Sequence, residues 1–200
     1  MARIFLLDKS GSMDAVLDDT IGGFNSFVRE QVPLGGTLTL YTFSDSCKCE
    51  FRDVPIDQVN PLCRDTYIPQ GNTALYDAMG KILKDYEGQE GTFVILTDGQ
   101  ENFSRKYTKS HVKDLIAVSK LNVMYVGVDI DAATDMGIRN TVEYDAARTP
   151  DIFRLVSESV SSTVVRQTQS QPVKRVCSTE AIDSSSQEST SRSAPNSPPS

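Results

Sequence analysis

Close to its start the chain reads Ile4-Phe5-Leu6-Leu7-Asp8-Lys9-Ser10-Gly11-Ser12-Met13. The four apolar residues are typical of a buried strand, and the polar residues that follow indicate a loop at its carboxyl end. In an open α/β sheet, ligands bind in the crevice beyond the carboxyl ends of the strands. Alternate residues of such a loop can direct oxygen atoms to one point, and Gly11 lets the backbone curl between them. Asp8, Ser10 and Ser12 are therefore candidate ligands of a hard cation such as Mg²⁺.

The composition indicates one domain with an appendage. A chain of 200 residues with 38% hydrophobic content can bury one core of ordinary size. The formal net charge is -7, and the charged residues after position 166 cancel one another, so the acidic excess belongs to the first part of the chain. Nucleic-acid binding depends on neutralising phosphates, so an acidic domain without a basic stripe argues against a nucleic-acid partner.

The sequence shows no targeting or membrane-spanning signal. No basic segment followed by an apolar stretch and a cleavage site opens the chain, and no run approaches the roughly 20 apolar residues of a membrane helix. We therefore expect a cytoplasmic protein without membrane contact. Cys47 and Cys49 do not have zinc-site spacing and are expected to be reduced strand residues, while His111 alone cannot build a histidine metal site.

Periodicity predicts strands and helices in alternation. Apolar or alternating runs predict strands at 4–7, 37–43, 47–54, 92–97, 122–128 and 142–144. Apolar positions at helical spacing predict helices at 14–32, 75–86, 109–120, 131–140 and 149–166, with Asp14 and Thr73 as caps of the first two. Within the first helix, Gly22-Gly23 suggests a close approach of helix and sheet.

This order of elements predicts a doubly wound α/β domain over residues 1–166. Strands that alternate with helices form a mainly parallel, Rossmann-like sheet with helices on both faces. A three-residue connection makes 47–54 an antiparallel edge strand. Residues 167–200 are rich in Ser, Thr, Gln and Pro and lack apolar periodicity, so we expect a disordered tail.

Two further segments point to the same end of the predicted sheet. Thr73 stands at the start of a helix, and Asp98-Gly99 follows a fully apolar strand. Together with Asp8-Lys9-Ser10-Gly11-Ser12, they resemble the metal-ion-dependent adhesion site of von Willebrand factor A-type domains. The family pattern is Asp-x-Ser-x-Ser, then a threonine, then an aspartate that is commonly followed by glycine. The resemblance covers about residues 2 to 166.

The resemblance implies a metal site made of Asp8, Ser10, Ser12, Thr73 and Asp98. Mg²⁺, or Mn²⁺ in its place, takes near-octahedral oxygen coordination and usually keeps waters. The three hydroxyls are neutral ligands, while the two aspartates, directly or through water, supply negative charge. In the family, a partner's glutamate or aspartate often completes the coordination, so that the metal bridges two proteins.

The sequence therefore predicts a metal-dependent protein–protein interaction module with no catalytic residues and no organic cofactor. One alternative is a phosphohydrolase with Asp8 as nucleophile and Asp98 holding Mg²⁺. Such enzymes resemble Asp-x-Asp-x-Thr, and this chain has Ser10 where the second aspartate, the proton donor, should stand. Another alternative is a structural subunit with an inactive metal site. The partner's identity and the oligomeric state are not specified by the sequence.

Overall fold

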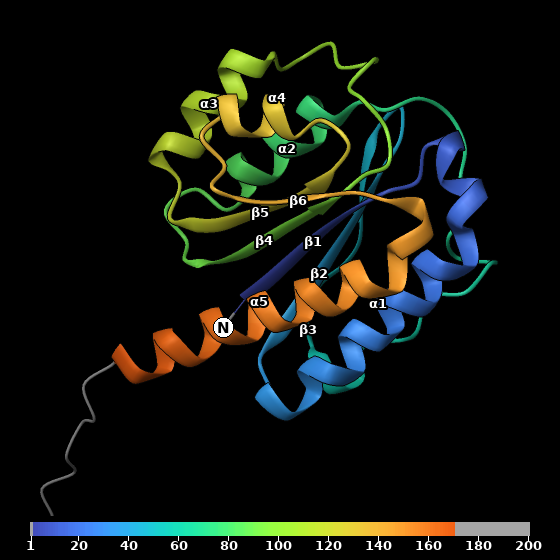
Figure 1. Ribbon diagram of the computed structural model, residues 1–200. Coiled ribbons are helices and arrows are strands. Elements are labelled where there is room, and N and C mark those ends of the chain that lie inside the picture. The colour runs from blue at the N-terminus through green and yellow to red at the C-terminus, as the bar shows by residue number, and fades with distance from the viewer. Residues whose placement is uncertain (1, 171–200) are drawn as a thin grey trace, which may run out of the picture. The chain divides into compact units, whose positions relative to one another are not determined.

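A single sheet runs through the protein, whose computed structural model describes residues 2–170 (Figure 1). Within this range the sheet has the spatial order β3-β2-β1-β4-β5-β6. β3 is antiparallel to β2, and all the other neighbouring strands are parallel. The strands are β1 (Ala2–Asp8), β2 (Thr37–Phe43), β3 (Cys47–Pro55), β4 (Gly91–Leu96), β5 (Leu121–Gly127) and β6 (Asn140–Glu143).

Helices cover both faces of this sheet, as Figure 1 shows. α1 (Leu17–Gln31) and α5 (Thr149–Ser170) lie together on one face. α2 (Leu75–Asp85), α3 (Lys109–Val118) and α4 (Ile130–Asp135) cover the other. The predicted doubly wound α/β fold with a mainly parallel sheet is thus confirmed.

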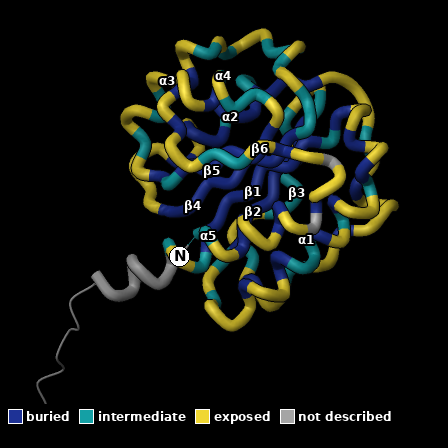
Figure 2. The backbone as a smooth tube through the Cα atoms, viewed as in Figure 1, coloured by how far each residue is buried: buried dark blue, intermediate teal, exposed yellow. Residues whose placement is uncertain are grey.

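The apolar strands explain why the sheet lies in the middle of the molecule. Successive side chains of a strand point to opposite faces, so an uninterrupted apolar run buries both. In β1, Phe5 and Leu7 enter the core beneath α1 and α5, while Ile4 and Leu6 enter the core beneath α2 and α3. The central strands are accordingly buried along their length (Figure 2).

β3 is the antiparallel edge strand that the sequence predicts. Its residues are only half-buried or exposed, in contrast to the buried β2 beside it. Cys47 and Cys49 are free thiols that pack against the core on the α2 side, as expected of ordinary strand residues. Charged side chains along such an edge oppose pairing with other chains.

The start of the first helix differs from the prediction. A 3-10 helix spans Gly11–Val16, and the α-helix begins only at Leu17, so Asp14 does not cap it. Gly23 approaches α5 instead of the sheet, because a Cβ placed there would lie 2.1 Å from Cδ2 of Phe153. The glycine therefore serves helix-to-helix packing, which periodicity alone does not distinguish from helix-to-sheet packing.

The last helix is longer than predicted. α5 continues to Ser170, four residues past the expected end at Arg166. The rest of the predicted tail, residues 171–200, lies outside the described residues. Within the described part of the chain, no helix combines the length and apolar character needed to cross a bilayer.

Candidate metal centre

Asp8 ends the central strand β1 and is fully buried. Its Oδ1 accepts the backbone N–H of Ser10 at 2.7 Å, and its Oδ2 accepts the hydroxyl of Thr97. The hydroxyl of the buried Tyr67 donates to the main-chain oxygen of Asp8. These contacts hold the carboxylate and the backbone of Asp8 in place, so the position of its side chain is set by the fold.

Two serines connect the loop after β1 to the loop after β4. The hydroxyls of Ser10 and Ser12 lie 3.2 Å apart, and Ser12 donates to Oδ1 of Asp98 at 2.6 Å. Ser10 is buried, Asp98 is half-buried and Ser12 is exposed. This row of oxygen atoms therefore runs from the interior of the sheet to the surface.

Thr73 reaches the same place from the loop before α2. Its backbone N–H donates to Oδ1 of Asn102 at 2.9 Å, and the Asn102 N–H donates to the Thr73 carbonyl at 3.1 Å. The predicted capping role of Thr73 is wrong: Ala74 is the N-cap residue of α2, and no side chain caps the helix there. Thr73 is buried, with 3% of its surface exposed.

Gly99 shows how close the three loops come. A Cβ built on Gly99 would lie 3.0 Å from the Thr73 hydroxyl and 3.8 Å from Oδ2 of Asp8. The backbone N–H of Gly11 also donates to the carbonyl of Gly71 at 3.1 Å, which ties the first loop to the segment before Thr73. The structure therefore brings the five predicted ligands, Asp8, Ser10, Ser12, Thr73 and Asp98, to one end of the sheet.

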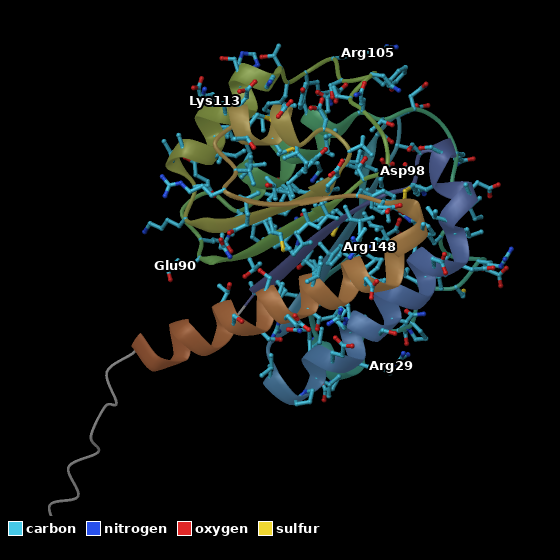
Figure 3. All side chains as sticks on the ribbon, viewed as in Figure 1. Arg29, Glu90, Asp98, Arg105, Lys113 and Arg148 are labelled. Carbon is cyan, nitrogen blue, oxygen red and sulfur yellow. The ribbon has the colours of Figure 1, made fainter. Side chains whose placement is uncertain are left out.

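That end is a topological switch point. From β1 the chain crosses to β2 on one side, and β4 lies on the other side, so the loops after β1 and β4 diverge and leave a crevice. Figure 3 places Asp98 at this end, between the two helical layers. The location agrees with the general position of ligand sites in open α/β sheets.

The electrostatics of the two carboxylates suit a cation. Burial raises the pKa of Asp8 to about 6, and the nearby Asp98 adds to the increase, while hydrogen bonds from Thr97 and Ser10 oppose it. Burial also raises the pKa of Asp98, and the hydrogen bond from Ser12 opposes that rise. No Lys, Arg or His side chain that the structure describes forms an ion pair with either carboxylate. A bound cation would supply the missing positive charge.

The donor set fits a hard divalent ion. It has two carboxylates and three hydroxyls, all oxygen ligands of the kind Mg²⁺ and Mn²⁺ take. The part of the chain that the structure describes contains no cluster of three or more His, Cys, Asp or Glu side chains arranged for a metal. Any ion held here would therefore rely on hydroxyl groups as well as on the two carboxylates.

The sequence interpretation missed the residues that support these ligands. Thr97 and Tyr67 hold Asp8, and Asn102 holds Thr73. Glu101 accepts the N–H of Tyr76 at 2.9 Å and so fixes the start of α2. Only Thr97 had a local signal, because it is a polar residue between an apolar strand and Asp98.

Comparison with solved structures identifies the fold as that of von Willebrand factor A-type domains. Similar structures include proximal thread matrix protein 1 from the mussel byssus (18% identity, TM-score 0.59), in which 80% of this chain aligns with 45% of that chain. The ArnB paralog VWA2 from Sulfolobus acidocaldarius aligns at 16% identity and a TM-score of 0.59, over 76% of this chain and 43% of that one. The chain therefore spans less than half the length of these two proteins.

A von Willebrand factor type A protein from Catenulispora acidiphila is also similar (13% identity, TM-score 0.53, 78% of this chain and 41% of that one). A further structure of the mussel protein has zinc in its metal-ion-dependent adhesion site (18% identity, TM-score 0.55, 78% of this chain and 45% of that one). No family model matches the sequence. No curated protein matches it either. At these identities the comparisons establish the fold alone.

Proposed function

We propose that the chain is a metal-dependent protein-binding module of von Willebrand factor A type. The observation that carries the proposal is the convergence of five oxygen-bearing side chains from three loops at the switch point of the sheet. The link from Ser10 through Ser12 to Asp98 and the approach of Thr73 to Asp8 beside Gly99 support one shared site. The zinc-occupied adhesion site of the mussel protein supports a divalent ion in a site of this kind.

In this proposal Ser10, Ser12 and Thr73 hold Mg²⁺ or Mn²⁺ through neutral hydroxyls, and Asp8 and Asp98 bind directly or through water. Because only two of these five ligands are charged, the ion keeps much of its positive charge. An Asp or Glu carboxylate of the partner protein then completes the coordination. Ser12 and Asp98 are the ligands open to solvent, so the partner's carboxylate approaches from their side.

Metal titration of the wild type tests the first part of the proposal. Mg²⁺ or Mn²⁺ is added to wild type, Asp8→Ala and Asp114→Ala, and binding is followed by calorimetry and thermal melting with EDTA as reference. Asp114 is an exposed carboxylate on α3, so its removal is a matched control. We expect one ion per chain and a higher melting temperature in wild type and Asp114→Ala, since a ligand that prefers the native state stabilises it.

Absence of binding in the wild type would contradict the proposal and favour a structural subunit with an inactive site. Equal binding in Asp8→Ala would place the ion elsewhere. If one ion binds as expected, a pull-down with and without EDTA identifies metal-bridged partners. Loss of a captured protein in Asp98→Ala, with retention in Asp114→Ala, would tie that protein to the site.

We further propose that the module is not an enzyme. A phosphohydrolase of the aspartate type needs a carboxylic acid two residues after its nucleophile to protonate the leaving group. Ser10 occupies that position, and its hydroxyl contacts Ser12. Incubation with an acyl phosphate followed by hydroxylamine tests this: a hydroxylamine-sensitive phosphoaspartate at Asp8 would overturn the non-enzymatic assignment.

A further inference from the structure

A groove of about 540 Å³ lies between α2 and the loop that follows Asp98. Four basic side chains line it, in a chain whose net charge is -7. We call it the basic groove and define it by Lys81, Lys84, Arg105 and Lys106, with Phe103 in its wall and Asp45 at its rim.

The acidic residues of the groove are already engaged. The Asp77 carboxylate accepts the backbone N–H groups of Arg105, Lys106 and Tyr107 at 3.0, 2.8 and 2.8 Å. Asp85 accepts Nζ of Lys81 at 2.7 Å. Asp77 therefore shapes the loop that carries the basic side chains, and the charge of Lys81 is matched within the fold.

Three cations of the groove form no close ion pair, although the charge of Lys106 contributes to lowering the pKa of Asp77. Arg105 and Lys106 form no ion pair with any residue in the described range, and Lys84 has only a 3.9 Å contact with Glu87. The Arg105 guanidinium lies 4.7 Å from the ring centroid of Phe103, which restricts its orientation. A side chain that is already oriented loses less freedom when it binds an anionic group.

The groove shares its loops with the candidate metal centre. At the rim, Oδ1 of Asp45 accepts the N–H of Asn72 at 2.6 Å, and Asn72 directly precedes Thr73. In the wall, Phe103 directly follows Asn102, which holds the backbone of Thr73. Figure 3 shows Arg105 on the loop that leads on from Asp98. A segment bound at the metal can therefore continue into the groove.

The other side of the site has the opposite charge. One hollow of about 520 Å³ is lined by Asp98, Glu143 and Asp145 together with Arg148. A neighbouring hollow of about 500 Å³ is lined by Asp129, Asp131 and Glu143. A long polyanion such as a nucleic acid would meet this acidic side, whereas a short acidic peptide entering from the groove would not.

We propose that the basic groove binds an acidic segment of the partner protein, adjacent to the carboxylate that completes the metal site. The inference rests on the proposed function and specifies the partner: its metal-binding Asp or Glu is accompanied by further acidic residues that contact Lys84, Arg105 and Lys106. Because the opposite side of the site is acidic, the segment lies on the groove side.

The test uses a fluorescein-labelled hexaglutamate peptide as probe, with fluorescence anisotropy in Mg²⁺ and in EDTA. Wild type is compared with R105E/K106E and with the control K113E/R139E, which changes an equal number of cations lining a hollow of about 530 Å³ at the amino ends of β5 and β6. Lys113 lies on α3, away from Asp98 (Figure 3). A hexalysine peptide and an oligodeoxythymidylate serve as further probes.

In Mg²⁺ we expect R105E/K106E to lose about tenfold or more in affinity, since two charge contacts become repulsive, while the control keeps wild-type affinity. Added salt should weaken wild-type binding. The affinity of the neutral variant R105Q/K106Q should lie between those of the wild type and R105E/K106E. Unchanged melting temperatures of the variants would show that the effect is not unfolding.

The other possible outcomes distinguish the metal-site proposal from the basic-groove proposal. Binding that needs Mg²⁺ but is unchanged in R105E/K106E overturns the groove and leaves the metal site standing. Binding that survives EDTA but is lost in R105E/K106E supports the groove and contradicts the metal bridge. No binding of hexaglutamate to wild type, or tighter binding of the oligonucleotide or of hexalysine, overturns the acidic-segment proposal.

Discussion

At the residue scale, the buried carboxylate of Asp8 is the most costly feature of the candidate site. It has hydrogen-bond donors but no cation among the described residues, and burial raises its pKa from the ordinary 3.8 to about 6. The folded protein therefore holds a proton on Asp8 more tightly than the unfolded chain does. The penalty for an ionised Asp8 is absent below about pH 4, grows between about pH 4 and 6, and is complete above about pH 6.

Replacement of Asp8 by asparagine should therefore stabilise the metal-free protein at neutral pH. Asparagine keeps the size and one acceptor oxygen, its NH2 group can donate to the Thr97 hydroxyl, and the charge is gone, so the free energy of unfolding in EDTA at pH 7 should rise, by up to about 3 kcal/mol. The gain should vanish near pH 4, where the wild-type carboxyl is protonated. Denaturant unfolding at both pH values measures it, with Asp114→Asn as the exposed control. A variant less stable than wild type at pH 7 would contradict the prediction.

Gly99→Ala tests the spacing between the ligands. The new Cβ would lie 3.0 Å from the Thr73 hydroxyl, closer than nearly all real contacts, so that hydroxyl must shift. We expect Mg²⁺ affinity to fall about tenfold, by calorimetry, because Mg²⁺ demands near-ideal geometry. The melting temperature in EDTA should change little. Wild-type metal affinity in this variant would exclude Thr73 as a direct ligand.

The placement of Asp8 and Asp98 at one end of the sheet was predictable, because each follows a strong local pattern: an apolar strand ends in Asp8, and another precedes Asp98. Their supporting residues were not predictable. Tyr67 is 59 positions from Asp8 along the chain, and Asn102 is 29 positions from Thr73. Contacts over such separations depend on how the loops fold back, and this has no periodic signature in the sequence.

At the element scale, the packing of α1 against α5 rests on a small residue. Three aromatic rings surround Phe5 of β1: Phe24 and Phe27 from α1 and Phe153 from α5, with centroids 5.5, 5.3 and 6.2 Å away. The Phe153 ring packs directly against the backbone of Gly23. Helical periodicity predicted both buried faces but not that they contact each other, because it reports the direction of a face and not its neighbour.

The adjacent glycines provide a matched pair of variants. Gly23→Ala places a methyl group on the Phe153 ring, so we expect the free energy of unfolding to fall by about 1–3 kcal/mol. Gly22 is exposed and has no atom within 4 Å of its Cβ position, so Gly22→Ala should raise stability by up to about 1 kcal/mol. Equal effects in denaturant unfolding would contradict the helix contact.

At the scale of the whole molecule, the alternation of strands and helices was sufficient to predict the doubly wound architecture and the antiparallel edge strand. The two ends of the parallel strands then have different roles. The carboxyl ends carry the candidate metal centre and the basic groove. The amino ends carry Ala2, Gly91 and Leu121 in register across neighbouring strands.

Hydrogen exchange should reveal the different roles of the two ends of the parallel strands when Mg²⁺ is added. We expect slower exchange at the backbone N–H groups of Ser10, Thr73 and Gly99, which bond to Asp8, Asn102 and Thr97 within the three loops of the candidate metal centre. Peptides from the amino ends of β5 and β6 should exchange at unchanged rates. Protection spread evenly over the sheet would instead indicate general stabilisation without a local site.

The course of α5 has a practical consequence for how this domain can be presented. α5 starts near the carboxyl ends of the strands, where Thr149 contacts Tyr144, and passes back so that Thr163 meets Asn122 at the amino end of β5. Ala2 begins β1 at that same amino end. Attachment of the domain to a sensor chip or display scaffold through either Ala2 or Ser170 therefore orients the candidate binding face away from the support.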